Sequence, residues 1–75
     1  MKTEISITDL EAAINYWRQT HPSEGEELRL TQKAAALAEP YAMMIMTRRH
    51  LLSIEPLDLE AQEAIEQWRV ATGRA

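Results

Sequence analysis

The sequence predicts an all-α fold, a small three-helix domain whose central helix is kinked at a proline. Apolar residues recur at helical spacing in three segments of the 75-residue chain, and, apart from Pro40, the prolines and glycines fall at or near their ends. A third observation is an alanine-rich stretch in the middle, which favours helix. We expect one domain over residues 1–75, with helices at about 9–20, 32–50 and 59–72.

The first helix is indicated by a capping signal and an apolar stripe. Thr8 is a suitable N-cap, and Glu11 three residues later completes a capping box. His21-Pro22 disfavours helical geometry before the proline, so the helix is expected to end near residue 20. Its inner face is predicted to consist of Leu10, Ala13, Ile14 and Trp17.

The central helix contains a proline, which leaves two interpretations. We expect Thr31 to be its N-cap, and Pro40 to disturb it by removing one backbone hydrogen bond. One interpretation is a kinked helix over 32–50, and the other is a short helix to residue 38 followed by a new one. The kinked helix is favoured because the apolar spacing continues past the proline.

The central helix is apolar on nearly every side, which predicts that it forms the middle of the fold. The two tryptophans, Trp17 and Trp68, are expected to close the core from either side. The predicted core residues of the central helix are Ala35, Leu37, Ala38, Tyr41, Met44 and Ile45.

The third helix is expected to start after Asp58 and to stop at Gly73. Residues 55–66 contain five acids and no bases, which we interpret as a solvated helix face. The predicted inner stripe is Ala61, Ala64, Ile65 and Trp68.

Two short alternations, Ile5-Ser6-Ile7 and Leu28-Arg29-Leu30, have the pattern of strands. They could pair as a small ribbon or serve as simple extended anchors. The sequence leaves both possibilities open.

Two similar words, Ala-Ile-Asn-Tyr-Trp-Arg at 13–18 and Ala-Ile-Glu-Gln-Trp-Arg at 64–69, lie in the first and third helices. In each, alanine, isoleucine and tryptophan share one helix face. We interpret the words as two outer helices meeting the same packing requirement. An ancient duplication and a shared binding role are the alternatives.

Residue types that carry catalysis are poorly represented. The chain has no cysteine, no nucleophile elbow, no phosphate-binding glycine loop and no metal-ligand cluster. His21 and His50 are far apart and are expected at a loop and a helix end. We therefore expect no enzyme activity, no cofactor and no metal.

The net charge of −4 opposes nonspecific binding to nucleic acids and anionic membranes. The beginning of the chain has no apolar segment like that of a signal peptide. The longest apolar-rich run, residues 34–46, is too short to span a bilayer. A cytoplasmic location is expected.

Met43-Met44-Ile45-Met46 is the strongest indication of function, because three methionines within four residues cannot all face one side of a helix. Methionine fills cores and also forms adaptable contact surfaces. We predict a protein–protein interaction or regulatory protein, adaptor-like, whose partner is another protein or a second copy in a homodimer. The predicted contact residues are Met43, Met46, Arg48 and Arg49.

The alternative function is a nucleic-acid-associated regulator. Arg29, Lys33, Arg48 and Arg49 could form a local basic patch that binds phosphate. The acidic third helix and the apolar central helix argue against a helix that enters a DNA groove.

Residues 7–18 with His21-Pro22-Ser23, and the later segment Ala36-Leu37-Ala38-Glu39-Pro40-Tyr41-Ala42, resemble a family of short proteobacterial proteins classed as a domain of unknown function. The resemblance covers most of residues 7–60. It implies a small helical bacterial protein without a transferable activity. Within such a family, the His-Pro motif and Tyr41 are natural places for a contact surface.

Overall fold

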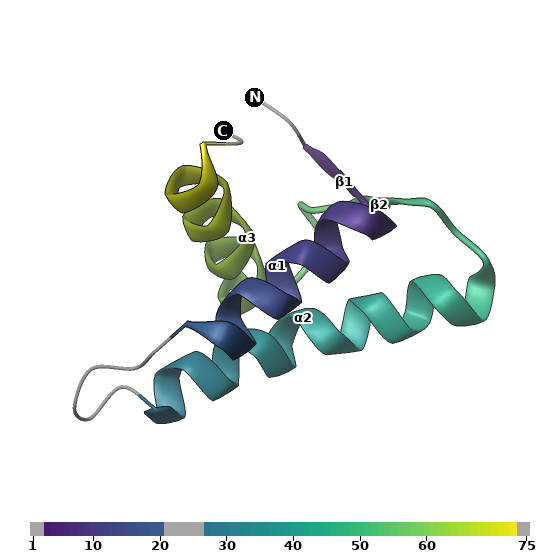
Figure 1. Ribbon diagram of the computed structural model, residues 1–75. Coiled ribbons are helices and arrows are strands. Elements are labelled where there is room, and N and C mark those ends of the chain that lie inside the picture. The colour runs from purple at the N-terminus through teal and green to yellow at the C-terminus, as the bar shows by residue number, and fades with distance from the viewer. Residues whose placement is uncertain (1–2, 21–26, 74–75) are drawn as a thin grey trace.

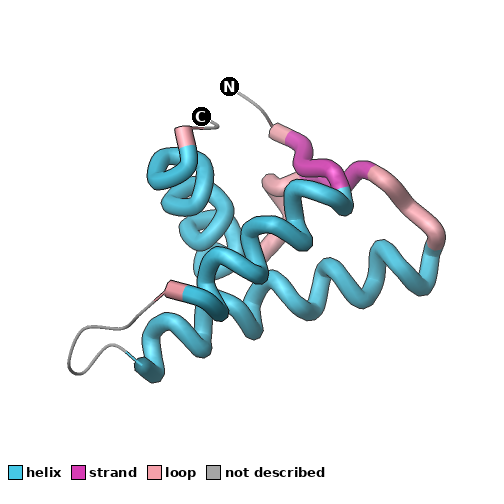
Figure 2. Tube along the Cα trace, in the orientation of Figure 1, coloured by secondary structure: helices cyan, strands magenta, loops and turns pink. Residues whose placement is uncertain are grey.

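Three helices and a two-stranded ribbon make up the described part of the chain. The computed structural model describes residues 3–20 and 27–73. The elements are β1 (Glu4–Ser6), α1 (Ile7–Gln19), α2 (Glu27–Thr47), β2 (Leu51–Ser53) and α3 (Leu59–Thr72). In Figure 1, α1 lies along α2, while α3 rises steeply from them and the ribbon covers one end. Figure 2 shows how small the strand content is. The three predicted helices are confirmed, and the two-stranded ribbon is an addition to the predicted all-α fold.

The ribbon joins segments that the sequence analysis did not pair. β1 and β2 run antiparallel, with Ile5 opposite Leu52. Hydrogen bonds from Ile7 N to His50 O (2.9 Å) and from Ile54 N to Thr3 O (2.8 Å) extend the ladder at both ends. Residues 28–30 belong to α2, so both interpretations of Leu28-Arg29-Leu30, as a strand of a ribbon and as an extended anchor, were wrong.

The first helix begins earlier than predicted. Ser6 is its N-cap, and the Ser6 hydroxyl accepts a hydrogen bond from Asp9 N at 3.1 Å. Thr8 is exposed inside the first turn, so the predicted capping box with Glu11 was wrong. The ribbon decides the start, because it holds Ser6 in the extended conformation that an N-cap needs. The predicted inner face is confirmed: Leu10, Ala13, Ile14 and Trp17 are all buried.

The second helix is one continuous element of 21 residues with Pro40 inside it. It begins at Glu27, so Thr31 is not its cap, because nothing in Leu28-Arg29-Leu30 opposes helix. The separate short helix to residue 38 is excluded. A kink at Pro40 stays a prediction.

Only one face of α2 is buried. Leu37 and Met44 are 0% and 1% exposed, as predicted, whereas Ala35 and Ile45 are exposed and Ala38 and Tyr41 are half-buried. The expectation of burial on several sides was wrong, because α1 and α3 both pack against the same side of the helix. An apolar outer face remains uncovered by the described residues.

The third helix has the predicted bounds. Asp58 precedes it without making a side-chain capping bond, and Gly73 ends it in the left-handed conformation at φ 73°. The predicted stripe of Ala61, Ala64, Ile65 and Trp68 is buried.

The two similar words meet inside the core. The Trp17 indole Nε1 donates a hydrogen bond to Ala64 O at 3.1 Å, and this contact is buried. Their arginines differ: Arg18 is exposed, whereas Arg69 is buried and donates to Glu4 O at 2.8 Å. The burial of both tryptophans supports the packing interpretation of the words.

Candidate interaction surface

A left-handed residue ends α2 and places the two arginines. Arg48 has φ 56°, and its backbone N donates to Ile45 O at 3.2 Å, while Arg49 N donates to Met44 O at 2.9 Å. These two bonds form the pattern of a Schellman motif, in which glycine is the usual left-handed residue. The helix therefore ends at Thr47 and not at residue 50, and both arginines follow the helix and are exposed.

The methionine surface consists of Met43, Met46, Arg48 and Arg49. The side chains of Met43 and Met46 are 56% and 79% exposed, whereas Met44 between them is buried in the core. Ile45 and Leu51 are also more than half exposed nearby in the chain. Four of the five predicted contact residues are therefore accessible at one end of α2, and Tyr41 is the exception.

Tyr41 lies elsewhere. It is half-buried on the side of α2 that faces α1, where it lines a small hollow together with Glu11. Partial burial, together with the negative charge of Glu11, raises the pKa of the Tyr41 hydroxyl above its ordinary value of 10.0. Tyr41 is thus separate from the methionine surface, because it lies two residues before Met43, which places the two side chains on nearly opposite faces of the helix.

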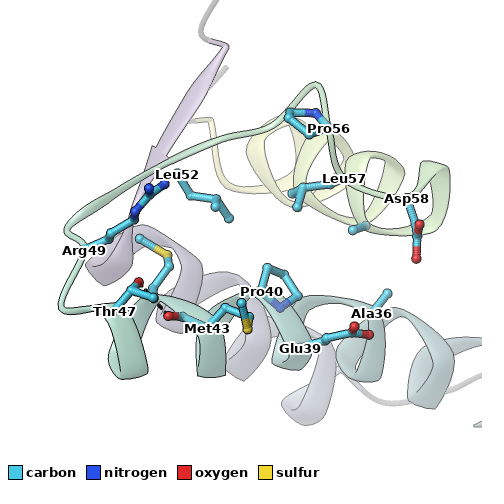
Figure 3. Close-up of a pocket in the computed structure, with 12 residues that line it drawn as sticks. Ala36, Glu39, Pro40, Met43, Thr47, Arg49, Leu52, Pro56, Leu57 and Asp58 are labelled. Carbon is cyan, nitrogen blue, oxygen red and sulfur yellow. Dashed lines mark hydrogen bonds between the residues drawn. The ribbon is translucent and has the colours of Figure 1, made fainter.

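An open groove of about 450 Å³ runs beside the methionine surface (Figure 3). One wall is α2, and the other is the segment from β2 to the start of α3. The only hint of this groove in the sequence is the apolar connector around Leu52 and Leu57. The lining residues are Ala36, Glu39, Pro40, Met43, Met44, Thr47, Arg49, Leu52, Pro56, Leu57, Asp58 and Ala61.

Charges of opposite sign mark the two ends of the groove. Figure 3 shows Arg49 at the end where α2 turns toward β2, and Glu39 and Asp58 toward the other end. All three side chains are exposed. Among the described residues, none of the three takes part in an ion pair. The groove therefore has an apolar middle, a basic end and an acidic end.

Lys33 does not belong to an exposed basic patch. Its side chain is 3% exposed, and its Nζ lies 3.7 Å from carboxylate oxygens of both Glu60 and Glu63. The same Nζ lies 5.7 Å from the centre of the Trp17 ring. The acidic run of α3 is thus partly a counter-charge for a buried lysine, and not only a solvated face.

His50 is the remaining candidate whose side chain the structure describes, and it does not line the groove. His50 is exposed after α2, whereas His21 and the His-Pro motif lie outside the described residues, as does the Arg29 side chain. Among residues 3–20 and 27–73, no three His, Asp or Glu side chains could together hold a metal ion. None of the helices described is long and apolar enough to cross a membrane.

The comparisons place the chain in a family without assigning an activity. The chain belongs to the DUF3717 family, proteins of unknown function, whose model matches residues 3–70. This confirms the resemblance to a family of unknown function. No curated protein and no solved structure matches the chain.

Proposed function

We propose that the chain is a small cytoplasmic, non-catalytic interaction protein, adaptor-like or regulatory, that binds a protein partner through the methionine surface. The observation that carries the proposal is the unequal burial of the methionines in Met43-Met44-Ile45-Met46. Met44 fills the core, whereas Met43 and Met46 are left 56% and 79% exposed.

Exposed methionines suit a contact surface for physical reasons. Each flexible thioether side chain adapts to an opposing surface and loses its contact with water on binding. Arg48 and Arg49 border these apolar groups, and arginine, like methionine, is enriched at protein interfaces. The adjoining groove gives the surface a concave part that a partner could fill.

A kink at Pro40 belongs to this proposal. Pro40 cannot donate a backbone hydrogen bond to residue 36, so the turns that carry Met43 and Met46 can tilt relative to the first half of α2. Experimental structures of the protein and of Pro40→Ala would show this tilt as a change in helix axis. Identical axes would remove the kink from the proposal.

The test is affinity capture with matched variants. Tagged protein, Met43→Glu and Met46→Glu would be compared in lysate of the source organism, with and without nuclease. Val70→Glu is the control, because Val70 is 65% exposed on α3. A partner retained by the protein and by Val70→Glu but lost with both methionine variants supports the proposal.

Equal capture by the methionine variants would contradict the surface assignment. Capture that disappears on nuclease treatment would favour the nucleic-acid alternative. That alternative is weakened by Lys33, which is buried beside Trp17 and two glutamates and so cannot join Arg48 and Arg49 in an exposed basic patch.

A further inference from the structure

We infer that the groove beside α2 is filled by a second copy of this chain, with the two α2 helices antiparallel across a two-fold axis. The inference rests on the proposed function and names its partner. It follows from the polarity of the groove and from the helix that forms its wall.

The groove's charges are arranged so that the groove is complementary to itself. Arg49 stands at one end, and Glu39 and Asp58 stand toward the other (Figure 3). In a two-fold interface, each contact occurs twice with the roles exchanged. An axis through the middle of the groove therefore brings Arg49 of each copy to the acidic end of the other.

The same charges select the direction of pairing. Two copies with parallel α2 helices would place Arg49 against the partner's Arg49 and acid against acid, which is unfavourable. The antiparallel arrangement places the basic end of each copy's groove against the acidic end of the other's. From Glu39 to the helix end at Thr47 the rise is about 12 Å at 1.5 Å per residue, so the two charge contacts lie well apart on either side of the apolar middle.

The apolar middle supplies what an association needs between those contacts. Pro40, Met43 and Leu57 line it. Met43 is 56% exposed and Met46, one turn further along α2, is 79% exposed. Because α2 is both the groove's wall and the helix that carries these methionines, each copy can insert its own methionines into the groove of the other.

Reciprocal charge variants test this pairing. Sedimentation velocity over a concentration series would compare the full chain, Arg49→Glu, and the double variant Glu39→Lys with Asp58→Ser. Serine is chosen at position 58 because it is, like aspartate, a residue type favoured just before a helix. The full chain is expected to dimerise. Each variant alone places like charges together and should weaken self-association by about tenfold or more.

The decisive measurement is the mixture of the two variants. The carboxylate introduced at position 49 of the first would then meet the ammonium introduced at position 39 of the second, while the native Arg49 of the second meets the native acids of the first. The mixture should form a heterodimer although neither component self-associates. Circular dichroism of each variant checks that it is folded, and Arg49→Gln and Glu39→Gln replace any variant that is not.

Several outcomes would overturn the inference. A monomeric full chain would do so, as would a dimer indifferent to both charge variants or a mixture that stays monomeric. A dimer weakened by only one of the variants would also contradict a two-fold pairing. A monomer that still captures a protein through Met43 and Met46 would leave the proposed function standing and remove only the second copy as its partner.

Discussion

At the scale of single residues, two basic side chains are buried among the described residues, Lys33 and Arg69, and Lys33 is the one that lies beside carboxylates of α3. The Lys33 ammonium is shielded from water and lies near Glu60, Glu63 and the face of Trp17. The two carboxylates are 44% and 62% exposed, so they keep much of their hydration while the lysine loses its own. An ion pair of this kind adds little net stability, but removing the carboxylates destabilises the fold because the buried ammonium is left without a counter-charge.

Removal of the acids and removal of the lysine should therefore differ in effect. Glu60→Gln with Glu63→Gln leaves the ammonium without a counter-charge, and we expect a loss of about 1–2 kcal/mol in the free energy of unfolding. Lys33→Met keeps the packing against Trp17 and should change stability by less than about 1 kcal/mol. Urea denaturation measures both, and an equal loss in the two variants would contradict the assignment.

The contact between Tyr41 and Glu11 makes stability depend on pH. The pKa of the Tyr41 hydroxyl is raised above 10.0 in the folded chain, by partial burial first and by Glu11 second. The stability contributed by the neutral hydroxyl is therefore fully present below pH 10.0 and is lost as pH rises through the folded-state pKa.

Ultraviolet titration of phenolate absorbance would locate that pKa in a Tyr16→Phe background, which leaves Tyr41 as the one tyrosine. Glu11→Gln should lower the Tyr41 pKa part of the way, because the charge is removed while the burial remains. Glu39→Gln is the control and should leave it unchanged. A Tyr41 pKa at or below 10.0 in the Tyr16→Phe background with Glu11 intact would refute the interpretation.

At the scale of elements, the end of α2 rests on an unfavourable backbone conformation. Arg48 occupies a left-handed position that glycine adopts without a steric cost. Arg48→Gly should raise the free energy of unfolding by about 0.5–1 kcal/mol, and Arg48→Asn by less. Arg48→Val should destabilise the chain, because a β-branched side chain is poorly tolerated there. Urea denaturation checks this order, provided that the dependence of the unfolding free energy on urea is the same in all variants. A midpoint of Arg48→Val equal to or above that of the unchanged chain would disprove it.

The buried faces of α1 and α3 and the bounds of α3 were predictable, whereas the starts of α1 and α2 were not. The stripes of α1 and α3 follow from spacing alone, because a helix with one apolar side has one way to bury it. Ser6 became the cap of α1 because β2, more than forty residues later, holds it extended. Such a long-range cause is invisible to a local pattern, and the same holds for the pairing of Ile5 with Leu52.

The interaction surface was partly predictable for the same reason. The exposure of Met43 and Met46 follows from helical geometry, since Met44 already occupies the core side. The groove depends on how the segment from Leu52 to Asp58 folds back beside α2, and the burial of Lys33 depends on the position of α3. Both are properties of the tertiary arrangement.

At the scale of the whole molecule, the beginning of the chain holds the ribbon and α3 together. Ile5 is 1% exposed in the core, and the carbonyl of Glu4 accepts a hydrogen bond from Arg69 near the end of α3. A 75-residue domain has a small stability margin, so a contact between distant segments accounts for a large share of it.

Loss of the Ile5 side chain should therefore be felt throughout the molecule. Ile5→Ala is expected to lower the free energy of unfolding by about 2–4 kcal/mol, through lost burial and the cavity left behind. Thr3→Ala is the matched control, because Thr3 is exposed and the change should stay within about 0.5 kcal/mol. Thermal melts followed by circular dichroism would measure both, and a small effect of Ile5→Ala would mean that the ribbon frays without loss of the helices.

The burial of Trp17 and Trp68 has a practical consequence. They are the chain's two tryptophans, one on α1 and one on α3, and they are 8% and 2% exposed. Neither lines the groove beside α2. Intrinsic fluorescence therefore carries a separate signal from each outer helix, and Trp17→Phe or Trp68→Phe isolates one emitter. Unfolding of α1 and of α3 can be timed without a label, and the emission should not change when another molecule occupies the groove.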